Sequence, residues 1–250
     1  MPVASTAAPD PIMSDKPLNQ RRFRRVRKAF GERFPGLRTR LIDLTAHGTA
    51  AAIRRRAARV DWTREGRAHV DAALARGPVV LVCWHESLPI APFFMRDLPV
   101  PVTSIHAPSP AGRIGEVHAI ALGLTPEVVH KGWTPRDLLR RVRQGGVAAL
   151  AVDGPSGPAR VAKPAALDWA RATGAELVLF AAGTDRGRRL PSWDRMIWPS
   201  GRRGIASFAP GPTATGRGAA ARDAARQDLQ AMLTRHADDV QRRAGMTRTP

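Results

Sequence analysis

The sequence has 250 residues, enough for one domain with a full hydrophobic core, and 43% of its residues are apolar. Its formal charge is +19, and nearly all of its 40 basic residues are arginine. Because a guanidinium binds phosphate in a bidentate manner, this charge indicates a membrane surface, nucleic acid or a phosphorylated substrate as partner. A general compositional bias, seen also in the abundance of Ala, Gly and Pro, is the alternative source of the arginine excess.

Cysteine content and hydropathy exclude several classes of protein. The single cysteine, Cys83, rules out an internal disulfide, and no Cys/His cluster predicts a zinc site. Cys83 lies inside an apolar run, where a small core residue is expected rather than a nucleophile.

No window approaches the ~18 apolar residues of a membrane span. Arg21-Arg22 superficially matches a twin-arginine export signal, but no apolar segment follows. We therefore expect a cytoplasmic protein, at most peripheral on the inner face of the plasma membrane.

The N-terminal part of the chain divides into two segments. Residues 1–18 are rich in Pro, Ala and Ser and predict a disordered tail. Residues 19–59 form a very basic segment with helical spacing, in which apolar residues recur between the arginines. This pattern is typical of an amphipathic helix on an anionic membrane surface, but a solvated basic face packed on the domain fits equally. Nucleic acid is not the expected partner, because neither aromatic stacking platforms nor a reader module is present.

Helical and strand patterns alternate from residue 60 to 212. The expected elements are helix 63–76, strand 79–84, short helix 87–95, strand 100–105, helix 112–122, strand 127–129, helix 135–143, strand 147–152, helix 164–173, strand 177–182, and a terminal strand pair of 195–198 with 205–208. A linker and an amphipathic helix over 219–243 complete the segment 213–250. The alternation predicts an α/β domain with a layered, mostly parallel sheet flanked by helices.

Two of the expected strands run directly into polar residues. His85 and Glu86 follow the run that starts at Val79, and Asp153 follows the run 147–152. Since the carboxyl ends of parallel strands carry the chemistry of an open α/β sheet, these side chains are candidates for one shared site. Imidazole can take a proton from a substrate hydroxyl near neutral pH, and a carboxylate normally holds its tautomer. A structural histidine is the competing interpretation.

Two loops supply candidate anion-binding groups. After Asp153, glycines allow close backbone approach and turn N–H groups can form an anion-binding nest beside a positive rim, although a plain connection fits the same pattern. The residues concerned are Gly154, Pro155, Ser156, Gly157, Pro158, Arg160 and Lys163. In the second loop, Lys131 precedes a helix start and Arg136 lies within the helix, so this end is a candidate anion site or simply a surface loop. The stretch Ser192-Trp193-Asp194-Arg195 favours a structural Asp–Arg pair under the tryptophan.

A family resemblance follows from these motifs. In chain order, Trp84-His85, Lys131-Gly132, Asp153-Gly154-Pro155-x-Gly157-Pro158 with Lys163-Pro164, and Ser192-Trp193-Asp194-Arg195 resemble a bacterial branch of the lysophospholipid acyltransferase superfamily. That branch, of unassigned function, is similar to the lipid A late acyltransferases and the glycerol-phosphate acyltransferases. The resemblance spans roughly residues 60–212. It implies a glycerol-phosphate-acyltransferase-like α/β fold, with His85 as base and Asp153 in place of the Glu of the superfamily's Gly-Thr motif.

The sequence departs from the family pattern at two positions. The superfamily has Asp or Glu five residues after its catalytic His, where this chain has Ile90. Glu86 is the carboxylate nearest in sequence, but a neighbour at a strand end usually points the other way. Asp153, arriving from the neighbouring strand, is the alternative partner of His85. Ser156 replaces an Arg that is more frequent in this branch, which removes one charge from the loop.

The resemblance implies transfer of a fatty acyl group from acyl-CoA or acyl-carrier protein to a hydroxyl of a lysophospholipid or related glycolipid. The expected partners are this lipid acceptor, the thioester donor and an anionic membrane surface, with no cofactor and no metal. Lys131, Arg136, Arg160 and Lys163 would hold a phosphate, and N–H groups in the loop 154–157 would stabilise the oxyanion. The alternative is a catalytically impaired relative that binds anionic lipid or nucleic acid.

Overall fold

The computed structural model describes residues 35–130, 133–213 and 218–246. Contacts between Cα atoms divide the chain into residues 1–42 and residues 43–250. The sheet, the helices that cover it and the candidate site all lie in residues 43–250. The expected tail, residues 19–34 of the basic segment and Lys131 lie outside the described residues.

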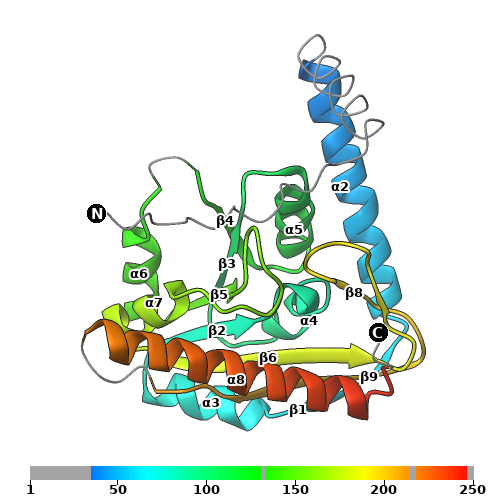
Figure 1. Ribbon diagram of the computed structural model, residues 1–250. Coiled ribbons are helices and arrows are strands. Elements are labelled where there is room, and N and C mark those ends of the chain that lie inside the picture. The colour runs from blue at the N-terminus through cyan, green and yellow to red at the C-terminus, as the bar shows by residue number, and fades with distance from the viewer. Residues whose placement is uncertain (1–34, 131–132, 214–217, 247–250) are drawn as a thin grey trace, which may run out of the picture. The chain divides into compact units, whose positions relative to one another are not determined.

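A seven-stranded sheet forms the centre of residues 43–250 (Figure 1). Its strands, in spatial order, are β1 (Asp61–Glu65), β9 (Arg203–Pro210), β6 (Glu176–Thr184), β2 (Val79–Cys83), β5 (Val147–Ala151), β3 (Val102–His106) and β4 (Thr125–Val128). All neighbours pair in parallel except β6 and β9. The expected mostly parallel α/β sheet is therefore confirmed.

Helices cover both faces of this sheet. The α-helices are α2 (Pro35–Ala57), α3 (Arg67–Arg76), α4 (Pro92–Met95), α5 (Pro110–Ile120), α6 (Arg136–Arg143), α7 (Ala165–Thr173) and α8 (Ala219–Arg243). Alternate residues of β2 face opposite layers: Leu81 and Cys83 pack with α3 and α4, while Val80 and Val82 pack with α6, α7 and α8. The uninterrupted apolar run of this strand thus has the physical reason that both of its faces are buried.

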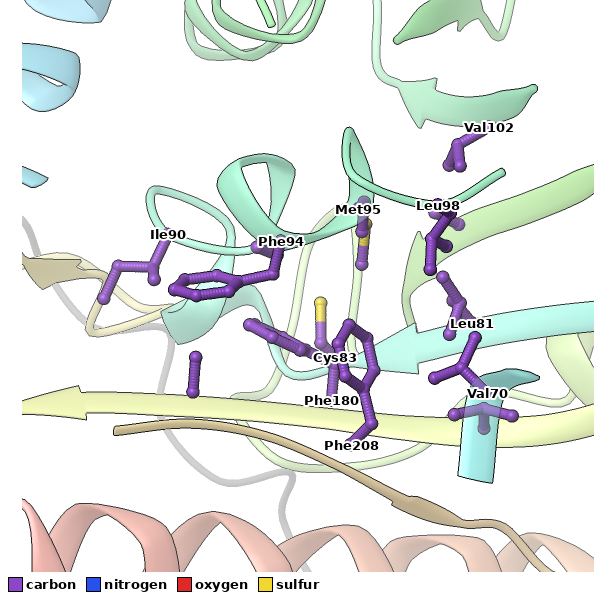
Figure 2. Packing of buried hydrophobic residues seen from close by; sticks show 14 of the residues in the cluster. Val70, Leu81, Cys83, Ile90, Phe94, Met95, Leu98, Val102, Phe180 and Phe208 are labelled. Carbon is purple, nitrogen blue, oxygen red and sulfur yellow. The ribbon is translucent and has the colours of Figure 1, made fainter. Parts of the chain in front are cut away.

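The core on the α4 side contains two aromatic strand residues and the start of α4. Phe180 of β6 and Phe208 of β9 have ring centroids 5.1 Å apart, and Phe94 of α4 lies 5.9 Å from Phe180. Figure 2 shows Ile90 and Phe94 above Cys83 and the two strand phenylalanines. Ile90 is fully buried in this cluster. The segment after β2 is therefore fixed by apolar packing, which sets the direction in which its first residues, including His85, leave the strand.

Two parts of the expected element order are wrong. Residues 63–65, expected to be helical, belong to β1, and α3 starts only at Arg67, after Gly66, which has φ 71°. The expected pairing of 195–198 with 205–208 does not form. Instead β8 (Ile197–Trp198) pairs with β7 (Arg188–Arg189) in a separate two-stranded sheet, and β9 joins the main sheet beside β6. Both errors concern pairings that are set by distant parts of the chain.

Helix α2 has a buried and an exposed apolar side. Ala46, Ala50, Ile53 and Ala57 are buried. By helical spacing, Leu44 lies on the opposite side, and its side chain is 71% exposed. In the parts of the chain that the structure describes, no helix has the length and apolarity of a membrane span.

Candidate active site

The two polar strand ends meet at the carboxyl edge of the sheet. Strands β2 and β5 pair in parallel, with Cys83 opposite Ala151. His85 and Asp153 each lie two residues beyond these partners, so the pairing register brings them level with each other. His85 begins the short 3₁₀ helix η1 (His85–Ser87), which turns the chain away from the sheet immediately after Trp84.

His85 and Asp153 form a hydrogen-bonded pair. The distance from His85 Nδ1 to Asp153 Oδ1 is 2.9 Å, and the backbone N–H of His85 donates to the same oxygen at 2.9 Å. Because an ionised carboxylate only accepts, this contact assigns the proton to Nδ1 and leaves a free lone pair on Nε2. The imidazole is 15% exposed and the carboxylate 1% exposed, so only the ring reaches solvent. The arrangement is that of a histidine general base held by a buried carboxylate.

The hydrogen bonds to Asp153 keep its carboxylate ionised despite its burial. Burial alone would raise its pKa, but the hydrogen bonds from the His85 side chain and from the backbone N–H groups of Arg160 and His85 outweigh it. The pKa of Asp153 is therefore lowered. The Arg160 N–H donates to Oδ2 at 3.0 Å, so both carboxylate oxygens are occupied. A charged Asp153 favours the imidazolium that forms when Nε2 accepts a proton.

A glycine loop and a tryptophan enclose the imidazole. A Cβ built on Gly154 would lie 1.9 Å from His85 Cε1, so the ring rests directly on the Gly154 backbone. The Trp193 ring lies 5.0 Å from the imidazole, centroid to centroid, at 56°. A Cβ on Gly157, where φ is 73°, would come within 2.5 Å of the same indole. Trp193 is 41% exposed and thus forms a partly open apolar wall beside the base.

The loop also presents unused backbone donors. Within the described residues, the N–H groups of Gly154, Ser156 and Gly157 donate to no other group. Pro155 and Ser156 are exposed at the tip of the loop. Free N–H groups in a glycine loop next to a general base are suited to stabilise a developing oxyanion.

The carboxylate of Glu86 points away from His85. It is 3% exposed and accepts hydrogen bonds from Arg160 (2.6 and 3.2 Å), Arg189 (2.5 Å) and Gln241 (2.6 Å). Of the two carboxylates that the sequence offers as partners of His85, only Asp153 contacts the imidazole. Glu86 instead anchors η1 to the loop after β5, to β7 and to α8.

The position at which the superfamily has its acidic residue also lies away from the imidazole. Ile90 packs into the apolar cluster beneath η1 (Figure 2) and is fully buried. The carboxylate that the family pattern places on the same segment as the histidine comes here from the neighbouring strand. Asp153, the alternative partner that the sequence offers, is the carboxylate that contacts His85.

The predicted phosphate-binding cations that the structure describes have different surroundings. The Arg160 guanidinium is occupied by Glu86 and Asp238. Lys163 is half-buried, and within the described ranges its ammonium forms no ion pair. Arg136 is exposed at the start of α6, and no hydrogen bond of the described residues links it to His85. Lys131 lies outside the described residues.

Sequence reasoning missed the residues that surround the pair. The sequence places Trp193 over a local Asp–Arg pair and does not indicate that its indole lies against His85, as the structure shows. Gln241 was not singled out, although a signal exists. It continues the inward spacing of Leu229, Leu233 and Ala237 on α8, where a polar residue requires a buried partner.

Fold and site together define an α/β protein whose sheet edge carries a His–Asp pair suited to general-base chemistry. No family model matches the sequence, and no curated protein sequence is significantly similar to it. Among solved structures, the fold is similar to that of the 1-acyl-sn-glycerophosphate (LPA) acyltransferase PlsC from Thermotoga maritima. That similarity covers 81% of this chain and 83% of the other, with a TM-score of 0.48 and 12% sequence identity. At these values the likeness carries no argument about substrate or mechanism.

Proposed function

We propose that this protein is an O-acyltransferase that moves a fatty acyl group from acyl-CoA or acyl-carrier protein to a hydroxyl of a lysophospholipid or related glycolipid. The observation that carries the proposal is the His85–Asp153 hydrogen bond of 2.9 Å, which occupies Nδ1, together with the 15% exposure of the imidazole. The motif resemblance to lysophospholipid acyltransferases supports the choice of reaction. The unused N–H groups of the loop after Asp153 support a transfer at a carbonyl carbon.

In the proposed reaction, His85 Nε2 takes the proton of the acceptor hydroxyl as its oxygen attacks the thioester carbonyl carbon. Asp153 stabilises the imidazolium, and N–H groups from Gly154, Ser156 and Gly157 stabilise the oxyanion. The tetrahedral intermediate then collapses, the carbon–sulfur bond breaks, and the imidazolium returns its proton to the leaving thiolate. Every proton movement uses one imidazole, so the reaction needs neither a metal nor a cofactor.

Arg160, one of the cations that the sequence offers for a phosphate, is bound by carboxylates in the structure. Since the Arg160 guanidinium is occupied by carboxylates, we assign a phosphate of the acceptor or donor to Lys163, Lys131 and Arg136. Trp193, half-exposed beside the base, is suited to contact the apolar part of a substrate. Glu86 is not part of the proposed catalytic pair.

We also propose that the protein binds the inner face of the plasma membrane. The charge of +19 supports attraction to anionic lipids. The exposed Leu44 supports an apolar contact through α2. Binding to anionic vesicles should therefore weaken with salt and with the substitution Leu44→Gln, as measured by vesicle co-sedimentation.

The enzymatic proposal is tested with purified protein, a radiolabelled acyl thioester and a mixture of lysophospholipids. His85→Ala should lower the rate of labelled product formation by about 10²–10⁴, the usual contribution of a general base. His69→Ala, which removes an exposed histidine on α3, is the matched control and should retain the wild-type rate. A His85→Ala rate equal to that of wild type would refute the proposal. Vesicle binding without product from any variant would instead favour a non-catalytic lipid-binding protein.

A further inference from the structure

A buried ion cluster lies directly behind the His85–Asp153 pair. Its members are Glu86, Arg160, Arg189, Asp238 and Gln241. The Glu86 carboxylate at the centre is 3% exposed, and the side chains of Arg160 and Arg189 are 24% and 15% exposed. Among these described members, two formal negative charges face two positive charges.

The cluster holds each segment that carries a group of the candidate site. Glu86 follows His85 in η1. Arg189 belongs to β7, which leads to Trp193. Gln241 of α8 donates to Glu86 and accepts from Arg189 at 2.5 Å, which ties the two segments to α8. Movement of any one segment would break hydrogen bonds to the other two.

Arg160 connects this cluster to Asp153 through its own backbone. Its N–H donates to Asp153 Oδ2 at 3.0 Å, while its guanidinium binds Glu86 at 2.6 Å and Asp238 at 2.6 Å. Its φ of 58° lies in the left-handed region, which is costly for a residue with a Cβ and persists only where surrounding contacts enforce it. The side-chain contacts therefore fix the backbone N–H that orients the carboxylate.

We propose that Arg160 is a positioning residue, which locks the His85–Asp153 hydrogen bond by joining Asp153 to Glu86. Replacing a buried ion pair by apolar residues often costs no stability, so orientation is the better account of the cluster. The role rests on the proposed function, because it concerns the geometry of the same base. It also reassigns Arg160 from the binding of substrate phosphate to the support of the catalytic pair.

The test compares Arg160→Gln with Arg160→Lys in the full-length protein. Arg76→Gln is the matched control. It removes a guanidinium that binds the Glu176 carboxylate in a bidentate manner, and these two residues are distant from each other in sequence. One readout is the NMR signal of the His85 Nδ1–H proton, assigned by its absence in His85→Gln. The other is kcat and KM for acyl transfer.

For Arg160→Gln we expect the Nδ1–H signal to broaden or vanish and kcat to fall by about 10-fold to 10²-fold, with KM close to wild type. Arg160→Lys should recover part of both, and Arg76→Gln should change neither. If Arg160→Gln does not fold, Asp238→Asn is the second variant. It weakens the ion pair between the Arg160 guanidinium and Asp238, the more exposed of its two carboxylate partners, and should change both readouts in the same direction. An unchanged signal, or a raised KM with unchanged kcat, would overturn the proposal. If even wild type lacks turnover, loss of the signal in Arg160→Gln still supports the positioning role while the proposed function fails.

Discussion

At the scale of single residues, the site depends on which groups lie against the imidazole of His85. Asp153 Oδ1 holds Nδ1, the Gly154 backbone lies beneath the ring, and Trp193 covers one side. A tautomer fixed by a buried carboxylate leaves Nε2 as the single basic atom that a substrate can reach. Small changes at these contacts should therefore alter activity more than stability.

Gly154 offers a specific test of this close packing. In Gly154→Ala, the new Cβ would occupy the position of the imidazole, 1.9 Å from Cε1, so the ring must move. A displacement of about 1 Å at a reacting group can cost about 10²-fold in rate, and we expect kcat to fall by that order. Gly48→Ala is the control, since no atom lies within 4 Å of its new Cβ and alanine favours the helix. Unaltered kcat in Gly154→Ala would show that the ring is not held where the structure has it.

At the scale of elements, the carboxylate of the pair comes from β5 rather than from the segment that follows β2. The register of β2 with β5 makes this possible, because Cys83 and Ala151 are direct partners. The segment after β2 is free to use Ile90 as an apolar anchor in the core. The position five residues after His85 is therefore structural in this chain.

Because Asp153 supplies the carboxylate and Ile90 packs in the core, we predict that a carboxylate introduced at position 90 will not act as the partner of His85. Ile90→Asp places a charge in a fully buried apolar cluster, which should lower the free energy of unfolding by several kcal/mol. The same substitution should not restore activity to Asp153→Asn. Ile90→Val, a smaller apolar side chain, should cost only about 1 kcal/mol. Urea denaturation of Ile90→Asp and Ile90→Val measures these stability differences, and a stable, active Ile90→Asp/Asp153→Asn double variant would contradict this role for Ile90.

The elements that the sequence predicts well are those whose pattern is local. The buried strands 79–83, 147–151 and 176–184 are apolar runs ended by glycine, proline or charge, and α8 begins and ends at the expected residues. Strand β1 is polar, with no alternation of buried and exposed residues, and forms only because β9 pairs with it. A pairing of that kind leaves no local signal in the sequence.

The candidate site shows the same limit. His85 and Asp153 are recognisable because each ends an apolar run, and the topology then brings them together. Glu86 has the same local context, but its direction depends on Arg160 and Arg189, which lie 74 and 103 residues away in sequence. Which of two carboxylates faces the imidazole is therefore a tertiary property.

At the scale of the whole molecule, buried histidines make stability depend on pH. Burial lowers the pKa of His106 and of His118 to about 4. In the unfolded chain a histidine titrates near 6.5, so between pH 6.5 and 4 the unfolded state binds protons that the folded state does not. Stability is therefore lost as the pH falls through this window.

We expect the free energy of unfolding to fall by about 2 kcal/mol for each of these two rings between pH 7 and pH 5. Urea denaturation at several pH values measures this slope. His118→Gln should make the free energy of unfolding depend less steeply on pH, by the contribution of one ring, whatever its effect on stability at pH 7. Below pH 4, Asp153 adds a further loss, because its lowered pKa stabilises the folded state only while it is ionised. Equal stability at pH 7 and pH 5 would exclude the neutral, buried state of both rings.

The central claim is that His85 and Asp153 act as one unit in acyl transfer. Its most direct test is the initial rate of thioester-to-lysolipid transfer by His85→Ala, Asp153→Asn and the double variant. Residues that act as a unit are strongly non-additive. We predict that each single substitution lowers the rate by about 10²–10⁴ and that the double variant is no slower than His85→Ala. An Asp153→Asn protein with the wild-type rate, or losses that multiply in the double variant, would contradict the account.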